Sequence, residues 1–120
     1  MSNYHIPVMP EEVLKYLSIK PGDWYIDCNL GGGGHTKTIL EKGGNVLGID
    51  LDPDSIAEVS SNLKSYIDNK RLILVQDNFS NLKSVIASAA KQSSPHHPEL
   101  VSESIRGILF DLGVSSYQLE

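Results

Sequence analysis

The sequence predicts an α/β fold in which a parallel sheet carries flanking helices. Short apolar segments alternate with segments of helical periodicity along the chain. Each apolar segment ends at or next to an aspartate: Asp27, Asp50, Asp77 and Asp111. Four glycines, Gly31–Gly34, follow the first of these segments. This order is typical of a strand, a tight loop and a helix at a ligand-binding βα turn.

The first expected element is a short helix over Pro10–Leu17. Pro10 suits the first helical position, and the two glutamates that follow it complement the helix dipole. After a turn at Pro21–Asp23, the first strand begins at Trp24 and ends at Asp27.

The helix after the glycines is expected to run from about Gly34 to Lys42 and to stop at Gly43–Gly44. Its inward side chains would be Ile39 and Leu40.

The second strand is Asn45–Asp50, which is mostly apolar, as a buried parallel strand should be. Asp52 is a suitable N-cap and Pro53 a suitable first residue for the helix that follows. The expected buried face of this helix comprises Ile56, Val59, Leu63 and Ile67.

The third strand is expected over Arg71–Asp77, followed by a helix that Ser80 or Asn81 would cap. Residues 92–104 break the helical periodicity and predict a long, mobile surface loop before a fourth strand at Ile105–Phe110. The buried face of the helix before that loop would comprise Leu82, Val85, Ile86 and Ala89.

The composition indicates one small domain of 120 residues with a net charge of −5, which is not the basic footprint of a nucleic-acid-binding surface. The sole cysteine, Cys28, excludes a disulfide within the chain and is expected to be a small core residue rather than a nucleophile. No signal-like or membrane-length apolar segment is present, so the cytoplasm is expected. The adjacent pair His96–His97 has no third ligand at metal-binding spacing, so no metal site is predicted.

The glycine run favours one class of cofactor over another. A dinucleotide fingerprint needs glycine or alanine at its sixth position, but Thr36 stands there when the count begins at Gly31. The Gly-Lys-Ser/Thr ending of a phosphate-binding loop is absent too. Asp27, just before the glycines, would repel a pyrophosphate and suits a cationic ligand such as S-adenosylmethionine, which carries a sulfonium and an ammonium group. The alternative is that the glycines form only a flexible turn.

The aspartates at the strand ends are expected to converge on one crevice, because ligands of open α/β sheets bind beyond the carboxyl ends of the strands. Asp50 is positioned to accept hydrogen bonds from ribose hydroxyls, and the alternative role of helix cap is already filled by Asp52. Phe79 could stack on adenine or pack in the core, and Asp77 could contact the ligand or cap its loop. The residues alone leave both of these choices open.

Four segments together resemble the RsmH/MraW family of bacterial small-subunit ribosomal RNA cytosine-N4 methyltransferases. They are His5–Leu14, Tyr25–His35, Gly48–Pro53 and Asp111–Leu119. The resemblance covers almost the whole chain except about residues 92–104. The Gly-Gly-Gly-Gly-His and Asp-Leu-Gly-Val-Ser-Ser motifs are the most specific to that family.

This resemblance implies a class I, Rossmann-like methyltransferase that uses S-adenosylmethionine. The cofactor-binding residues it implies are Gly33, Gly34, His35, Asp50 at the ribose, Phe79 by the adenine, Asp111 and Gln118. The implied substrate is the N4 amine of one cytidine in the 16S rRNA of the small ribosomal subunit. For catalysis, we hypothesise that Asp111 or a nearby backbone carbonyl accepts a hydrogen bond from that amine.

Two departures from the family pattern qualify this resemblance. Tyr117 stands where the family usually has proline, which would alter the loop that presents Gln118. The family's full chain is also much longer, so residues 1–120 are expected to be the N-terminal, cofactor-binding half of the methyltransferase domain, with the RNA-binding surface elsewhere. The alternatives are a binding module without transfer activity and a nicotinamide-dependent oxidoreductase, which the glycine spacing and Asp27 disfavour.

Overall fold

The computed structural model of the protein describes residues 18–90, 105–110 and 113–115. The expected helix at Pro10–Leu17, the expected loop at 92–104 and the pair His96–His97 lie outside the described residues. In the described part of the chain, no helix has the length and apolar character needed to cross a membrane.

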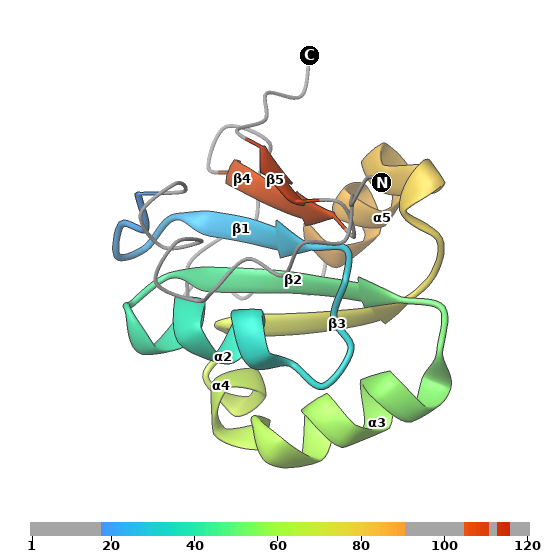
Figure 1. The fold of residues 1–120 in the computed structure, drawn as a ribbon, viewed down its shortest axis with the longest axis horizontal. Helices are drawn as coiled ribbons and strands as arrows, with labels where there is room; N and C mark the ends of the chain where they lie inside the picture. Colours follow the sequence, from blue (N-terminus) through green and yellow to red (C-terminus); the bar gives the residue numbers. More distant parts are fainter. Residues whose placement is uncertain (1–17, 91–104, 111–112, 116–120) are drawn as a thin grey trace, which may run out of the picture.

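The centre of the fold is a sheet with the strand order β3-β2-β1-β4-β5 (Figure 1). Neighbouring strands from β3 to β4 pair in parallel, and β5 pairs with β4 in the antiparallel direction. The strands are β1 (Trp24–Asp27), β2 (Asn45–Asp50), β3 (Leu72–Gln76), β4 (Ile105–Phe110) and β5 (Gly113–Ser115). The predicted α/β class and the four parallel strands are therefore confirmed.

The sequence did not predict β5. This strand has only three residues, and its pairs with β4 are Ile108 with Ser115, Leu109 with Val114 and Phe110 with Gly113. A segment this short shows no alternation of its own, so its extended conformation is defined by pairing with β4.

The helices are α2 (Gly34–Glu41), α3 (Pro53–Asn62), α4 (Lys64–Asp68), the short 3-10 helix η1 (Phe79–Asn81) and α5 (Leu82–Ala90). Asp52 caps α3 as predicted, since its Oδ1 accepts a hydrogen bond from Asp54 N at 2.9 Å. The expected single helix is interrupted at Leu63, whose φ of −120° separates α3 from α4.

The prediction that Ser80 or Asn81 caps the helix after β3 is wrong. Asn78 is the capping residue, because its side-chain oxygen accepts a hydrogen bond from Ser80 N at 2.9 Å. Ser80 and Asn81 lie inside η1, which leads directly into α5. The sequence offered several adjacent residues able to cap, and only the backbone path decides which one is used.

The two faces of the sheet are covered by different helices (Figure 1). Tyr25 on β1 packs with residues of α2 and α3 in one buried cluster, whereas its neighbours Trp24 and Ile26 pack with residues of α5 in another. This alternation follows from the two-residue period of a strand. Most of the predicted inward residues are buried, namely Ile39, Leu40, Val59, Leu63, Val85, Ile86 and Ala89. Ile56, Ile67 and Leu82 are only partly buried.

Arg71 organises the edge of the sheet at which β1, β2 and β3 begin. Its Nη2 donates hydrogen bonds to Leu40 O at 2.7 Å and to Gly44 O at 2.8 Å, and its Nε donates to Asn45 Oδ1 at 3.2 Å. The guanidinium also lies over the Tyr66 ring, 5.1 Å from its centroid. One side chain thus ties the end of α2 to the starts of β2 and β3.

Candidate functional site

A pocket of about 260 Å³ lies at the opposite edge, beyond the carboxyl ends of β1, β2 and β3. This is the edge at which open α/β sheets bind ligands. The residues that line it are Cys28, Asn29, Ile49, Asp50, Leu51, Asp77 and Asn78. The lining combines carboxylate and amide groups with apolar side chains, as binding sites for small polar molecules usually do.

Asp50 connects the end of β2 to the glycine loop. Its Oδ1 accepts a hydrogen bond from Asp52 N at 2.9 Å, and its Oδ2 accepts one from Gly31 N at 3.3 Å. Because each carboxylate oxygen can accept more than one hydrogen bond, Asp50 keeps acceptor capacity toward the pocket that it lines. Asp50 does not cap α3, because Asp52 is its N-cap, and the predicted ligand role of Asp50 stays a prediction.

Asp77 orders its own loop and lines the pocket as well. Its backbone N–H donates to Asp50 O at 3.2 Å, which extends the pairing of β2 and β3 by one step. Its Oδ1 accepts a hydrogen bond from Asn78 N at 2.6 Å. The loop-ordering role that the sequence left open is therefore present.

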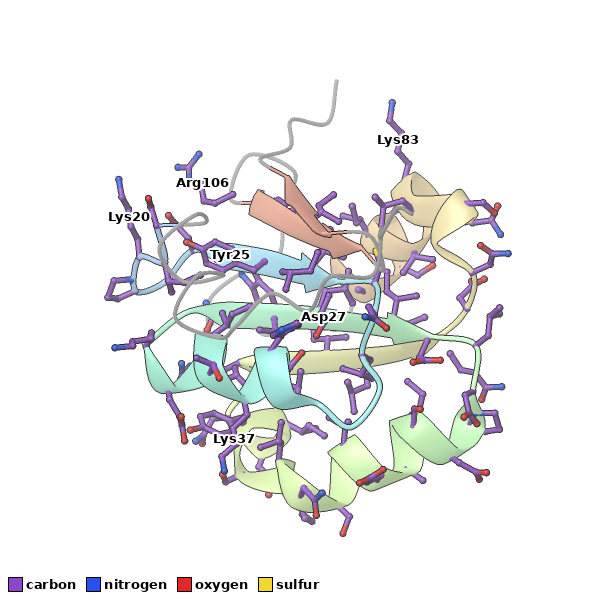
Figure 2. All side chains as sticks on the ribbon, viewed as in Figure 1. Lys20, Tyr25, Asp27, Lys37, Lys83 and Arg106 are labelled. Atoms are coloured by element: carbon purple, nitrogen blue, oxygen red, sulfur yellow. The ribbon has the colours of Figure 1, made fainter. Side chains whose placement is uncertain are left out.

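Asp27 differs from the other two acids, and the expectation that it faces the same crevice is wrong. Figure 2 shows Asp27 near the end of β1. Its side chain is fully buried, and it is not among the residues that line the pocket. Thr36 Oγ1 donates to its Oδ2 at 2.7 Å, and Asn29 N donates to its Oδ1 at 3.0 Å. Asp27 lies on the same face of β1 as Tyr25, and the first turn of α2 encloses its side chain through Thr36.

Burial raises the pKa of Asp27 above the ordinary value of an aspartic acid, because the ionised form is removed from water. The hydrogen bonds from Thr36 and Asn29 N, and then the charge of His35, act in the opposite direction. The negative charge of Asp50 adds to the increase.

Gly33 and Gly34 form the junction between the loop and α2. Gly33 is the N-cap of α2 with a φ of 87°, and a Cβ there would lie 3.0 Å from Val59 Cγ2. Its N–H donates to Leu30 O at 2.7 Å, which makes the turn tight. Gly33 is buried and Gly34 is exposed, while His35 is partly buried. None of the three lines the pocket, although the same loop begins there at Cys28 and Asn29.

The other predicted site residues cannot be placed relative to the pocket. The backbone of Phe79 begins η1, directly after the pocket residue Asn78, but its side chain lies outside the described part of the structure. Asp111, Tyr117 and Gln118 also lie outside it. Their assigned roles remain predictions.

Leu51 is a pocket residue that the sequence analysis missed. Its side chain is 64% exposed, although it is a large apolar group at the pocket wall. The available signal was its position between two acids, directly after a strand-end acid and before a helix. An apolar side chain that water surrounds at the rim of a pocket is a candidate contact for the flat face of a base.

Cys28 and Asn29 were also not predicted to line a pocket. Cys28 is partly buried and packs against the cluster on the α5 face of the sheet, so its expected core role is right only in part. Among residues 18–90, 105–110 and 113–115, no three histidine, cysteine or acidic side chains are grouped so as to hold a metal ion.

Comparison with known proteins places the chain in a family. Residues 2–120 match the model of the MraW methylase family. The chain belongs to this family. The protein named ribosomal RNA small subunit methyltransferase H of Dehalococcoides mccartyi is 44% identical over 119 residues, which are 97% of this chain and 30% of that protein. The protein of the same name from Clostridium botulinum is 41% identical, over 97% of this chain and 34% of that protein. The chain thus spans about a third of the length of these curated relatives.

Solved structures show the same fold at low sequence identity. An rRNA methylase from Streptococcus thermophilus has a TM-score of 0.60 and 18% identity, covering 86% of this chain and 54% of that one. An RNA methyltransferase from Salinibacter ruber in complex with S-adenosyl-L-homocysteine has a TM-score of 0.53 and 19% identity, covering 62% of this chain and 52% of that one. The fold is therefore that of the class I methyltransferases.

Proposed function

We propose that this chain binds S-adenosylmethionine at the described pocket, as the cofactor-binding part of an rRNA methyltransferase. The proposed substrate is the N4 amine of cytidine 1402 in the 16S rRNA of the small ribosomal subunit. Membership of the MraW methylase family and the names of the curated relatives support this proposal. A cytoplasmic location follows from the proposed substrate. The observation that carries the proposal is Asp50, whose carboxylate lines a pocket at the end of β2.

The pocket residues fit the adenosine part of this cofactor. Asp50 offers carboxylate oxygens to ribose hydroxyls, and the exposed Leu51 offers apolar surface to a base. Asp77 and Asn78 add polar groups at the same rim, where the exocyclic amine or ring nitrogens of a base would find partners. When bound, the cofactor supplies an electrophilic methyl group on its sulfonium.

The chain's own contribution to transfer would be placement. In the proposed reaction, the N4 nitrogen of cytosine forms a bond to the methyl carbon, the carbon–sulfur bond breaks, and N4 loses a proton. Holding the amine against the methyl group accounts for most of the acceleration expected from such a site. Asp111 is our candidate to accept a hydrogen bond from that amine, and the target base would have to leave any stack first.

Calorimetric titration tests cofactor binding directly. We expect S-adenosylmethionine to bind the 120-residue chain and Asp50→Ala to weaken binding by about tenfold or more, because a hydrogen bond to a charged group is lost. NAD, titrated in parallel, is expected not to bind. Tight binding of NAD would overturn the assignment of this pocket. Equal affinities of the unsubstituted chain and of Asp50→Ala for S-adenosylmethionine would overturn it as well.

Transfer requires a separate assay, because a binding module without transfer activity is a second candidate. The residues that line the described pocket account for cofactor binding, and none of them is a candidate for acting on the amine. Methyl incorporation into cytidine of small ribosomal subunits distinguishes the two. An Asp111→Asn variant that binds cofactor but transfers no methyl would support the proposed catalytic role, and full activity of that variant would exclude it.

A further inference from the structure

The glycine loop is closed by a buried hydrogen bond between its two ends. Thr36 Oγ1 donates to Asp27 Oδ2 at 2.7 Å, across nine positions of sequence. Both side chains are fully buried. Asp27 is the last residue of β1, and Thr36 lies in the first turn of α2. The bond therefore joins a strand to a helix and fixes the distance over which residues 28–35 must turn.

The same carboxylate also holds the near side of the loop. Its second oxygen, Oδ1, accepts a hydrogen bond from Asn29 N at 3.0 Å, and Asn29 lines the pocket. Gly33 closes the far side through its N–H to Leu30 O. Asp27 is thus connected to the pocket wall without reaching the pocket itself.

A buried carboxylate is energetically unfavourable if its only role is to fill space in the core. Removing an ionised group from water is unfavourable unless donors surround it, and an apolar side chain of similar size would avoid this cost. The raised pKa of Asp27 is the sign of that cost. What the carboxylate provides, and an apolar group cannot, is two directed hydrogen bonds to two different parts of one loop.

We propose that Asp27 and Thr36 are positioning residues that hold the glycine loop in its ligand-binding conformation. This inference rests on the proposed function, because it assigns the loop to cofactor binding. Neither side chain would contact the cofactor. Without the bond, the loop samples other conformations, and the apparent affinity falls by the fraction of time spent outside the competent one.

Substitutions at Thr36 test the hydrogen bond with little change in shape. Thr36→Val removes the hydroxyl, Thr36→Ser keeps it, and Thr38→Val is the matched control in the same helix, where the hydroxyl donates to Gly34 O at 3.0 Å. With S-adenosyl-L-homocysteine as the probe, we expect Thr36→Val to lower affinity about tenfold, since a buried hydrogen bond is lost and its carboxyl partner is left without that donor. Thr36→Ser and Thr38→Val are expected to bind like the unsubstituted chain.

The titrations are made well below the melting temperature of every variant, so that a purely structural role predicts lower melting temperatures but unchanged affinity. Unchanged affinity of Thr36→Val would overturn the inference. If that variant does not fold, the pair Asp27→Leu with Thr36→Val removes both polar partners and leaves neither of them unpaired. Normal affinity of this double variant would overturn the inference equally.

Hydrogen exchange separates a failure of this inference from a failure of the proposed function. If the unsubstituted chain does not bind the probe, the proposed function is wrong. The exchange rates of the loop amides then test by themselves whether Asp27 and Thr36 hold the loop. We expect the amides of Gly31 and Gly33 to exchange faster in Thr36→Val and at the normal rate in Thr38→Val. Equal exchange in the two variants would overturn the positioning role.

Discussion

The two edges of the sheet use polar side chains in different ways. At the edge where the strands begin, the guanidinium of Arg71 is directed onto Leu40 O, Gly44 O and Asn45 Oδ1, so donors and acceptors satisfy one another. At the edge where the strands end, Asp50 and Asp77 bond to backbone amides of their loops and still line a pocket. At the first edge the polar groups bond to one another, whereas at the second edge the carboxylates also line a pocket, to which we assign a ligand as a proposal.

This difference indicates which substitutions should affect stability and which should affect binding. Figure 2 shows Lys20 and Arg106 near the start of β1 and Asp27 near its end. A change at the Arg71 edge should unfold the protein more easily without altering the pocket. A change at an exposed pocket residue should lower ligand affinity with little effect on stability. A change at Asp27, which is buried at the same edge of the sheet as the pocket, should affect both stability and affinity.

Arg71→Ala should have the largest effect on stability. It removes the Arg71 hydrogen bonds to Gly44 O, Asn45 Oδ1 and Leu40 O, of which Leu40 O keeps the N–H of Gly43 as a donor. It also removes the contact with Tyr66, so we expect the free energy of unfolding to fall by about 3 kcal/mol. Urea denaturation measures this loss. Arg71→Lys should recover only part of it, because an ammonium cannot reproduce the planar fork of the guanidinium. A loss as small as that of an ordinary surface substitution would contradict this account of the edge.

Asp27→Asn should change how stability depends on pH. Because the pKa of Asp27 is raised in the folded state, the folded chain keeps this proton after the unfolded chain has lost it at about pH 4. The contribution of Asp27 to the free energy of unfolding therefore falls as the pH rises from about 4 to the raised pKa of the folded chain. Above the raised pKa the contribution stays low. The variant lacks this dependence.

Urea denaturation at several pH values tests this prediction. The free energy of unfolding of Asp27→Asn, minus that of the unsubstituted chain, should increase with pH in that range and then level off. Any change in hydrogen bonding that does not depend on pH shifts the whole curve and leaves its shape intact. Asp54→Asn, at an exposed position in α3, is the control. A pH-independent difference for Asp27→Asn would be incompatible with a raised pKa.

Leu51→Ala should separate binding from stability most clearly. Since the side chain is 64% exposed, its removal should change the free energy of unfolding by less than about 0.5 kcal/mol. If a base covers it, the lost apolar contact should lower cofactor affinity by roughly fivefold to tenfold. Thermal melts and calorimetric titration of the same preparation give both values. Unchanged affinity would remove Leu51 from the binding surface.

Arg106→Ala should have the smallest effect. Arg106 Nε lies 3.2 Å from Asp23 Oδ2, but the arginine side chain is 56% exposed, and such pairs contribute little. We expect a loss of less than about 0.5 kcal/mol in urea denaturation, decreasing further at high salt. If Arg106→Ala lowered the free energy of unfolding as much as Arg71→Ala does, the exposure of Arg106 would not make its ion pair weak, and this account would be wrong.

Most of the fold could be predicted because its signals are local. Gly33 at the N-cap of α2, Asp52 at the N-cap of α3 and the apolar run of β2 each depend on neighbouring residues alone. The errors occur where distant segments decide. The strand β5 exists through its pairing with β4, and Asn78 rather than Ser80 or Asn81 is the cap because of the path the chain takes after β3.

The candidate site could be predicted in outline for the same reason. Asp50 was predicted to contact the ligand and Asp77 was left open between a ligand contact and a loop cap, and both line the pocket. Leu51 was missed because an exposed leucine and a buried one look alike in sequence. Asp27 was assigned to the crevice because a strand-end position does not reveal whether the next helix covers the side chain, as Thr36 of α2 covers Asp27.

The sequence by itself determined the alternation of the four parallel strands with helices, the glycine loop and the family to which the chain belongs, since each is a property of adjacent residues or of matching residues in relatives. The tertiary structure decided what the acids do. It exposed the carboxylate of Asp50 to a pocket and enclosed that of Asp27 against Thr36. The physical reason is that burial, and with it the pKa and the available hydrogen-bond partners, depends on which segments pack together.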